Sequence, residues 1–389
     1  MKLRTPLLAS GLALLCTVGY GQQYRGTGLA EWKARTTPQF TTRERQRAIG
    51  AMGCLGRERM GWLTPSADSP EAPWVAREIV PTLVELLGDK DPMIRRDAAC
   101  ALRNVGTAAK DAIPALTKLL DDRQMPVRDA AVRALGDMGC AAEPSLPALV
   151  KTIREDASAG VRLNAARALR KIGPEGPKLL LPMLEDNRKE VRLAAISAIA
   201  FMYDEREVRA PVPVVLRLAR DEDPEVRVNA VDLLFALRPR PAEAAALVPE
   251  LLRDKAPRVR RNTVCALMSV KDSERYLPDL SNLVNDEDVY TRGGLAYVLG
   301  SIGAPAVPLL ARLLDDKIAN VRGDAADSLG KIGPAAKDAA PSLKRLLTDM
   351  GRVHDLQGCV CNHAGEALAK ILHDGKYLEG LPPMPRDGP

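Results

Sequence analysis

One pattern occurs eight times in this chain. It consists of an aspartate, a β-branched residue five positions later, and an arginine directly after that residue. The occurrences lie 30 to 35 residues apart, and a leucine or isoleucine stands eight residues after each β-branched residue. Such a period is typical of stacked repeats, in which each unit buries its apolar face against its neighbours. The 389 residues are therefore predicted to form mainly one continuous array, not two or three ordinary domains. The β-branched residues that set the register are Ile94, Val127, Val161, Val191, Val226, Val259, Thr291 and Val321.

Each unit is predicted to hold two helices. The first has the pattern P-x-L-x-x-L-L and carries proline in its first turn, where the backbone N–H groups have no partner within the helix. The second starts near the register residue and is expected to end at a glycine with a left-handed conformation. The prolines are Pro81, Pro114, Pro147, Pro213, Pro278 and Pro308, and the glycines are Gly106, Gly139, Gly173, Gly303 and Gly333.

The composition fits thin layers between helices. Hydrophobic residues make up 46% of the chain, but aromatic residues only 3%. Alanine stands four residues after six of the register residues, where a small side chain lets neighbouring helices approach closely. These alanines are Ala98, Ala131, Ala165, Ala195, Ala230 and Ala325.

The recurring aspartates and arginines would attract attention as single functional residues, but their fixed register favours a structural ladder. Each aspartate can cap the second helix of its unit, or pair with an arginine of its own or the next unit. The ladder consists of Asp89, Arg95, Asp122, Arg128, Asp156, Arg162, Asp186, Arg192, Asp221, Arg227, Asp254, Arg260, Asp286, Arg292, Asp316 and Arg322.

With its unit length, first-turn proline and Asp…Val-Arg pair, the sequence resembles HEAT-repeat proteins. Its short, alanine-rich units are similar to the HEAT-like repeats of phycobilisome lyase subunits. The resemblance covers roughly residues 75–373. It implies an all-α, right-handed α-solenoid of about nine two-helix repeats. It does not imply one function, because such repeats serve many unrelated roles.

The ends of the array depart from the pattern. Residues 41–56 fit a second helix alone and are interpreted as an N-terminal cap, with Arg45 in the arginine position. A loop with Trp62 and Trp74 is expected at 57–77, so that residues 22–77 form the cap and loop. The array follows at 78–373. In its last unit Asp355 is assigned the aspartate position and Cys361 replaces the arginine. A Pro-rich, disordered tail is predicted at 374–389.

The N-terminus has the features of a secretory signal peptide. Lys2 and Arg4 precede a 15-residue apolar run that ends at Tyr20, and Gly19 and Gly21 suit a cleavage site. The run is short for a membrane span, which needs about 20 residues. Residues 1–21 are therefore expected to be removed and the protein exported, to the periplasm or outside the cell. Retention as an anchor and lipidation at Cys16 are the alternatives.

The last unit holds a group of potential metal ligands, His354, Cys359, Cys361 and His363. Two thiolates and two imidazoles can bind Zn²⁺. Against this, C-x-C-x-H lacks the usual C-x2-C spacing. A disulfide or redox role and ordinary structural roles at the end of the array are the alternatives, and no cofactor is predicted. Of the other cysteines, Cys54, Cys100 and Cys265 are interpreted as buried or half-buried thiols in helices.

In a right-handed stack the second helices line the concave face. Side chains three, six and ten residues after the register residue are expected to face solvent there. The predicted binding residues are Arg133, Asn164, Arg167, Lys171, Asn229, Asp232, Asn262 and Tyr297. Positive charge in the first units suits a protein partner or an extended acidic peptide. Nucleic acid is not expected as a partner. The net charge is +6 for the full chain and only +4 without the signal, and aromatic residues for base stacking are scarce.

The sequence therefore predicts an exported scaffold for protein–protein interaction without an integral membrane segment after signal cleavage. Enzymatic activity is not expected, because no nucleophile motif, phosphate-binding loop or dinucleotide glycine motif occurs in a fitting context. A lyase-like or metal-assisted enzyme accessory and a purely structural envelope protein are the alternatives.

Overall fold

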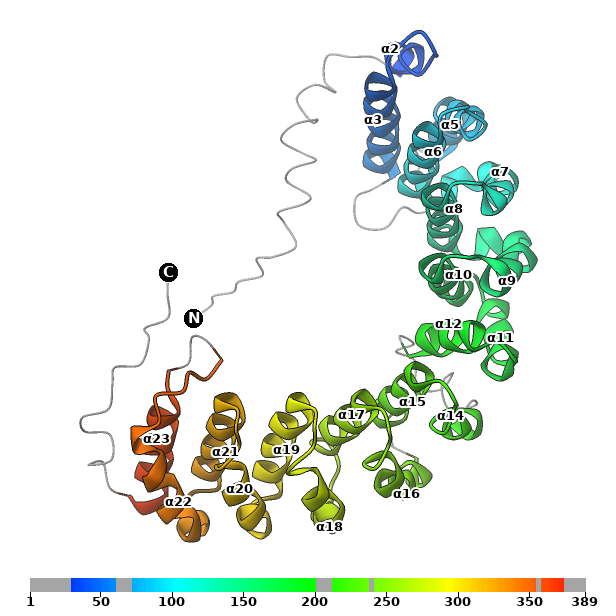
Figure 1. The fold of residues 1–389 in the computed structure, drawn as a ribbon. Helices are drawn as coiled ribbons and strands as arrows, with labels where there is room; N and C mark the ends of the chain where they lie inside the picture. Colours follow the sequence, from blue (N-terminus) through cyan, green and yellow to red (C-terminus); the bar gives the residue numbers. More distant parts are fainter. Residues whose placement is uncertain (1–28, 61–71, 201–211, 238–240, 355–357, 374–389) are drawn as a thin grey trace, which may run out of the picture. The chain divides into compact units, whose positions relative to one another are not determined.

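The computed structural model describes residues 29–60, 72–200, 212–237, 241–354 and 358–373 (Figure 1). The chain divides into two compact units, residues 1–201 and 202–389, which are treated separately below. The described residues are helical apart from turns and one isolated bridge between Arg352 and Cys359. None of their helices is both long and apolar enough to cross a membrane.

The helices of the first unit alternate between short first helices and longer second helices. They are α2 (Leu29–Ala34), α3 (Thr42–Met60), α4 (Ala72–Glu78), α5 (Val80–Leu86), α6 (Pro92–Val105), α7 (Ile113–Lys118), α8 (Met125–Asp137), α9 (Leu146–Glu155), α10 (Ala159–Lys171), α11 (Glu175–Leu180) and α12 (Lys189–Ile199).

The second unit continues the alternation. Its helices are α14 (Val212–Leu218), α15 (Pro224–Ala236), α16 (Ala242–Leu251), α17 (Pro257–Leu267), α18 (Leu277–Leu280), α19 (Val289–Ile302), α20 (Val307–Leu313), α21 (Ala319–Ile332), α22 (Ala340–Arg345) and α23 (Val360–Leu372).

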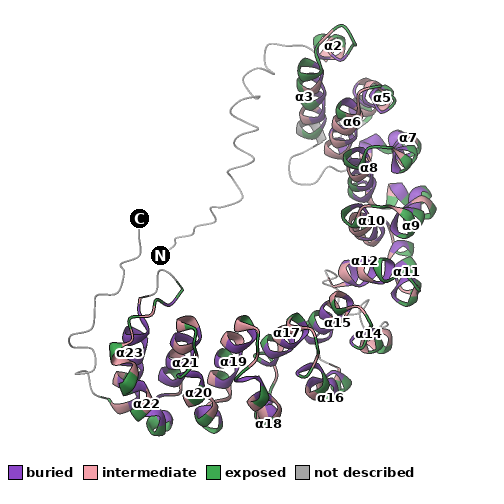
Figure 2. Cartoon of the chain, viewed as in Figure 1, coloured by how far each residue is buried: buried purple, intermediate pink, exposed green. Residues whose placement is uncertain are grey.

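The predicted all-α solenoid is confirmed. From α5 to α23 the described helices form nine first–second pairs, and each second helix packs on the second helix of the next pair within its unit (Figure 1). All eight register residues are at most 1% exposed. The core follows this seam of leucine, valine, isoleucine and alanine (Figure 2). Apolar burial at about 25 cal/mol per Å² is the main force that holds such layers together.

Proline and glycine set the helix ends as predicted. Proline occupies the first or second position of α5, α7, α9, α18 and α20. The five predicted glycines after second helices all have positive φ, between 57° and 90°. A side chain would be strained there, so glycine stops each helix at little cost.

Glycine also lies between second helices, at a position that the sequence analysis did not single out. This glycine stands nine residues after the register residue of its own repeat. It faces a small residue of the next repeat, which stands seven residues after the register residue of that repeat. A Cβ atom added to the glycine would lie 2.8–3.0 Å from this neighbour. The four pairs are Gly53–Ala101, Gly136–Ala168, Gly300–Ser328 and Gly330–Ala367.

The N-terminal cap differs from the prediction. The cap is not a second helix alone, because α2 precedes α3 and contacts it, with Trp32 buried. The segment predicted as a loop at 57–77 is partly helical, since α3 continues to Met60 and α4 begins at Ala72. Pro73 favoured a loop, but proline is tolerated in the first turn of a helix. The signal segment, Trp62, the Trp74 side chain and the tail lie outside the described residues.

Candidate functional site

Every ladder arginine closes the turn of its own repeat. Its Nη1 atom donates to the carbonyl oxygen of the aspartate six residues earlier, over 2.6–3.0 Å, in all eight repeats. The side chain of that aspartate accepts from the backbone N–H two residues later, as at Asp122 and Asp156. The turn between the two helices is therefore held from both sides.

The same arginine also holds the next repeat. Its Nε and Nη2 atoms bind both carboxylate oxygens of the next aspartate in five pairs, the geometry in which guanidinium–carboxylate bonds are strongest. The partners are almost buried: Arg292 and Asp316 are 4% and 6% exposed. The five pairs are Arg95–Asp122, Arg128–Asp156, Arg227–Asp254, Arg260–Asp286 and Arg292–Asp316.

The ladder continues into the N-terminal cap and departs from the sequence register at two later places. At the N-terminus Arg45 binds Asp89 and donates to the Thr36 carbonyl. In the first unit Asp186 accepts from Arg188 at 3.0 Å, and the buried Nε of Arg162 has no hydrogen-bond partner. At the end of the array Arg322 binds Asp349, six residues before the predicted Asp355, which lies outside the described residues.

Burial and ion pairing act in opposite directions on these carboxylates. Burial works to raise the pKa of Asp122 and Asp156, but the hydrogen bonds from Arg95 and Arg128 and from backbone amides lower it more. The net result is a pKa below the ordinary value of Asp for both groups, and also for Asp349.

These shifts make the array sensitive to acid. A carboxylate whose pKa is lower in the folded state contributes stability above its unfolded pKa, about 4, and loses it as the pH falls through the folded pKa. The urea midpoint should therefore change little between pH 7 and about pH 5 and fall steeply below about pH 4. Urea titrations followed by circular dichroism test this, and an acid-independent midpoint would contradict it.

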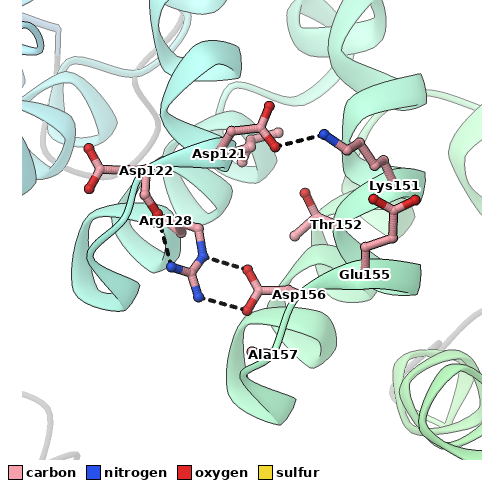
Figure 3. Close-up of a pocket in the computed structure, with 9 residues that line it drawn as sticks. Asp121, Asp122, Arg128, Lys151, Thr152, Glu155, Asp156 and Ala157 are labelled. Carbon is pink, nitrogen blue, oxygen red and sulfur yellow. Dashed lines mark hydrogen bonds and ion pairs between the residues drawn. The ribbon is translucent and has the colours of Figure 1, made fainter.

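A pocket of about 330 Å³ opens between two adjacent turns of the first unit (Figure 3). The Arg128–Asp156 pair lines it, and a Lys151–Asp121 ion pair at 2.8 Å lies across it. The charged groups of these two pairs already bind one another. The pocket is thus a crevice of the repeat interface and not the best candidate for a binding site.

The surface formed by the second helices, here called the second-helix face, is linked by polar bonds between repeats. In the second unit, hydrogen bonds join side chains of neighbouring repeats. One partner stands six residues after the register residue of its repeat, and the other stands three residues after the register residue of the next repeat. Examples are Asn262 with Asp232, at 2.9 Å, and Tyr297 with Asp324, at 2.9 Å. Several predicted binding residues therefore hold neighbouring repeats together as well as facing solvent.

The remaining predicted binding residues lie as follows. Arg133 is exposed and pairs with Asp129, which also accepts a hydrogen bond from Asn164. Lys171 is exposed and pairs with Asp137. Arg167 is half-buried, and Asn229 donates to the Glu225 carbonyl of its own helix.

The second helices of the two units differ in charge. Apart from the ladder arginines, α6, α8, α10 and α12 carry seven cations and four carboxylates. Lys189 and Glu190 belong to α12, and the remaining six cations and three carboxylates belong to α6, α8 and α10: Arg96, Arg103, Arg133, Arg167, Arg170 and Lys171 against Asp97, Asp129 and Asp137. The five second helices of the second unit carry four Lys or Arg residues outside the ladder and five carboxylates. The positive surplus is thus a property of the first unit.

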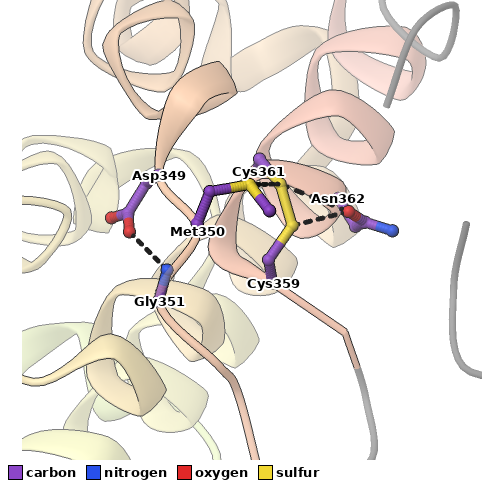
Figure 4. Close-up of a disulfide and its surroundings, with 6 residues drawn as sticks. All are labelled: Asp349, Met350, Gly351, Cys359, Cys361 and Asn362. Carbon is purple, nitrogen blue, oxygen red and sulfur yellow. Dashed lines mark hydrogen bonds between the residues drawn. A yellow bond between two sulfur atoms is a disulfide. The ribbon is translucent and has the colours of Figure 1, made fainter. Parts of the chain in front are cut away.

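The predicted metal ligands do not form a metal site. His354 Nε2 lies 2.9 Å from Asp324, and His363 Nδ1 lies 2.7 Å from Asp327. Cys359 and Cys361 form a disulfide, so neither is a thiolate (Figure 4). No group of three or more potential ligands gathers anywhere in the described part of the chain. Within the described residues the four predicted ligands are thus engaged separately, each histidine by its own carboxylate and the two cysteines by each other.

The disulfide lies where the inserted loop of the last repeat enters α23. Both sulfur atoms are close to the Asn362 amide oxygen, at 2.7 and 3.3 Å (Figure 4). Val360 and Cys361 donate backbone hydrogen bonds to Gly351 and Asp349. Of the free thiols, Cys54 and Cys100 are half-buried, whereas Cys265 is exposed and so differs from the prediction.

Tyr297, Asp324 and His354 form a polar network on the second-helix face. Tyr297 and His354 contact the same oxygen of Asp324, whose side chain is 5% exposed. Burial and the nearby carboxylates raise the pKa of Tyr297 to about 12, so its hydroxyl is a donor at neutral pH. The sequence analysis named Tyr297 and His354 but missed Asp324, which looks like any other polar position of a second helix.

Known proteins support the repeat architecture. A HEAT-repeat family model matches residues 43–136, 80–170, 146–211, 176–268, 211–290 and 277–353. The bilin biosynthesis protein MpeU of Synechococcus sp. (strain WH8020) is 31% identical over 104 residues, which are 27% of this chain and 35% of that relative.

Solved structures show the same fold at low identity. Importin beta aligns with a TM-score of 0.57 at 13% identity, over 95% of this chain and 54% of its own. The karyopherin Kap121p, bound to the extreme C-terminus of the phosphatase Cdc14p, aligns with a TM-score of 0.54 at 16% identity, over 96% of this chain and 50% of its own. Since the family model matches successive windows from residue 43 to residue 353, this chain belongs to the HEAT-repeat family.

Proposed function

We propose that the protein is a scaffold whose first unit binds an extended acidic segment of a partner protein. The observation that carries this proposal is the surplus of cations on α6, α8 and α10, six against three carboxylates. A surface with one predominant sign attracts segments of the opposite sign and orients their approach. The HEAT-repeat array itself is suited to protein–protein interaction.

An extended segment fits this surface better than a compact ligand. The cations belong to consecutive second helices, so they are distributed along the stack and do not converge on one pocket. Asp129 and Asp137 each hold neighbouring cationic or amide groups, which fixes the side chains before a partner arrives. Preorganised side chains lose less conformational entropy on binding. The Kap121p structure, with a chain terminus of another protein as its ligand, offers a precedent for this mode.

The proposal predicts the effect of a paired charge reversal. The double variant Arg133→Glu with Arg167→Glu should weaken binding of a labelled glutamate-rich peptide by at least about tenfold, because two attractive charges become repulsive. Arg133 is exposed but Arg167 is half-buried, so the melting temperature of the double variant is measured to verify that it folds like the wild type. Fluorescence anisotropy at several salt concentrations measures the affinity, and wild-type binding should weaken as salt rises.

A matched control separates local from overall charge. Lys118→Glu with Arg123→Glu makes the same change in net charge at exposed positions near the turn between α7 and α8. Its affinity should stay close to that of the wild type. Equal loss in the two double variants, or unchanged binding after reversal at Arg133 and Arg167, would contradict the proposed surface. Tighter binding of single-stranded DNA than of the peptide would identify a different class of partner.

We also propose that the protein is exported, on the basis of the N-terminal segment described above, which lies outside the described residues. Expression in a bacterial host with a secretion system should yield a mature chain that begins at Gln22. Amino-terminal sequencing distinguishes this from retention of Met1. An intact N-terminus would contradict cleavage.

A role as an accessory to an enzyme is the second candidate. Two observations favour it: the local similarity to a protein named for bilin biosynthesis, and the Tyr297–Asp324–His354 network. The similarity covers about a third of that relative, so its activity is not transferred as a whole. Binding is the proposed principal function, and any chemistry would have to come from the histidine network.

A further inference from the structure

We propose that His354 is a reactive nucleophile, activated by Asp324, whose chemical target is an acyl carbonyl such as an ester or thioester. This inference is independent of the peptide-binding proposal, because it concerns another unit of the chain. It starts from an imidazole that several contacts hold in one orientation although its side chain is 40% exposed.

The backbone of His354 and its hydrogen bonds to two neighbouring side chains, Asn320 and Asp324, fix the imidazole ring. His354 has φ 45°, a left-handed conformation that a residue with a Cβ atom rarely adopts. Its backbone N–H donates to Asn320 Oδ1 at 2.7 Å, and Nε2 lies 2.9 Å from Asp324 Oδ1. The preceding residue, Val353, packs tightly on Gly323: a Cβ atom added to Gly323 would lie 2.6 Å from the Val353 side chain. The backbone conformation does not distinguish His354 from His373, which has φ 54°; the contacts with Asn320 and Asp324 do.

The hydrogen bonds determine which nitrogen is free. Tyr297 donates its O–H to Asp324 Oδ1, and an ionised carboxylate can only accept. Nε2 of His354 must therefore carry the proton that it shares with Asp324. In the neutral imidazole Nδ1 then holds a lone pair, and it has no hydrogen-bond partner among the described residues. A buried carboxylate that sets the tautomer of an accessible imidazole is the arrangement used by acid–base and nucleophilic histidines.

The chemistry follows from these positions. The Nδ1 lone pair attacks the carbonyl carbon, a C–N bond forms, and the C–O or C–S bond to the leaving group breaks. The Asp324 carboxylate next to Nε2–H stabilises the positive charge that develops on the ring. The ring then passes its Nε2 proton through Asp324 to the leaving oxygen or sulfur, which departs as an alcohol or a thiol. Water attacks the acyl-imidazole, the C–N bond breaks, and a carboxylic acid and free imidazole are released. An uncharged carbonyl suits the site better than a phosphoryl group, because Asp324 and Asp327 lie one turn apart on α21.

His373 offers an internal control for reactivity. It is exposed at the C-terminal cap of α23, and no carboxylate partner is found for it in the described part of the chain. We therefore compare the two histidines in the full-length protein with p-nitrophenyl acetate. The readouts are the release of p-nitrophenolate and the site of acetylation by mass spectrometry, with removal of the label by hydroxylamine.

The expected result is acetylation of His354 at least about tenfold faster than that of His373. His354→Gln should abolish the fast phase, and Asp324→Asn should slow it by about tenfold. Tyr297→Phe removes one competing donor to Asp324 but leaves the His354 contact, so it should not slow the reaction. His373→Gln should leave the fast phase unchanged.

Equal labelling of His354 and His373 in the wild-type protein would overturn the proposal without reference to any variant. An equal slowing by Tyr297→Phe and Asp324→Asn would also overturn it, because it would mean that both variants only disturb the loop. Circular dichroism verifies that each variant keeps its helices. The 15N chemical shifts of the His354 ring provide a readout that is independent of activity, and a proton on Nδ1 in place of Nε2 would contradict the assigned tautomer.

Discussion

Replacing Asp316 with alanine is expected to destabilise the second compact unit by about 3–5 kcal/mol, the usual cost of leaving one member of a buried ion pair alone. The Asp316 carboxylate accepts from two nitrogens of Arg292 and from the Ile318 backbone N–H. Its loss leaves the Arg292 guanidinium, 4% exposed, without its bidentate ion-pair partner. Urea unfolding followed by circular dichroism and by a probe placed in the second unit measures the change.

The neighbouring residue provides the control. Asp315 also forms an ion pair with an arginine, Arg345, at 3.2 Å, but the partners are 66% and 60% exposed. Exposed pairs contribute about 0–1 kcal/mol, so Asp315→Ala should have a small effect. Arg292→Leu combined with Asp316→Ala should recover part of the lost stability, because the buried charge is then absent. Similar losses for Asp315→Ala and Asp316→Ala would contradict a ladder that depends on burial.

The second large effect is expected at a glycine between two second helices. Gly53→Ala should destabilise the first unit by about 1–3 kcal/mol, the usual cost of overpacking a core. The new Cβ atom would lie 2.9 Å from both Cα and Cβ of Ala101 on α6. Backbone atoms cannot move aside without separating α3 from α6. Urea titration of the variant and the wild type gives the difference in the free energy of unfolding.

Gly50, one turn earlier in α3, is the matched position. A Cβ atom at Gly50 would meet nothing within 4 Å. Alanine is favoured over glycine in a helix by about 1 kcal/mol, so Gly50→Ala should leave stability unchanged or raise it. Opposite signs for the two substitutions are the expected outcome. Equal effects would mean that helix propensity, and not the close approach of the helices, decides the result.

The fold could be predicted from the sequence because each repeat carries the same local signals. Pro114 starts a first helix, Gly139 stops a second helix, and Val127 sets the register. These signals act over a few residues and so can be recognised in one dimension. The repetition supplies the rest, since a residue type that recurs at one register position must satisfy the same environment eight times.

The details between repeats could not be predicted in the same way. Contacts such as Gly53–Ala101 and Tyr297–Asp324 depend on how far one helix is displaced along the next. The partner of Arg322 was missed because the inserted residues of the last repeat shift its aspartate to Asp349. The disulfide between Cys359 and Cys361 likewise depends on the geometry at the start of α23, which the C-x-C spacing alone leaves open.

Photo-crosslinking can locate the acidic segment that the first unit is proposed to bind on its second-helix face. The probe is a glutamate-rich peptide that carries a photoreactive group at successive positions. Cross-links to α6, α8 and α10 should appear in sequence order and disappear in the variant Arg133→Glu with Arg167→Glu. Cross-links confined to the turns around Asp122 and Asp156, or to the second unit, would contradict the proposed surface.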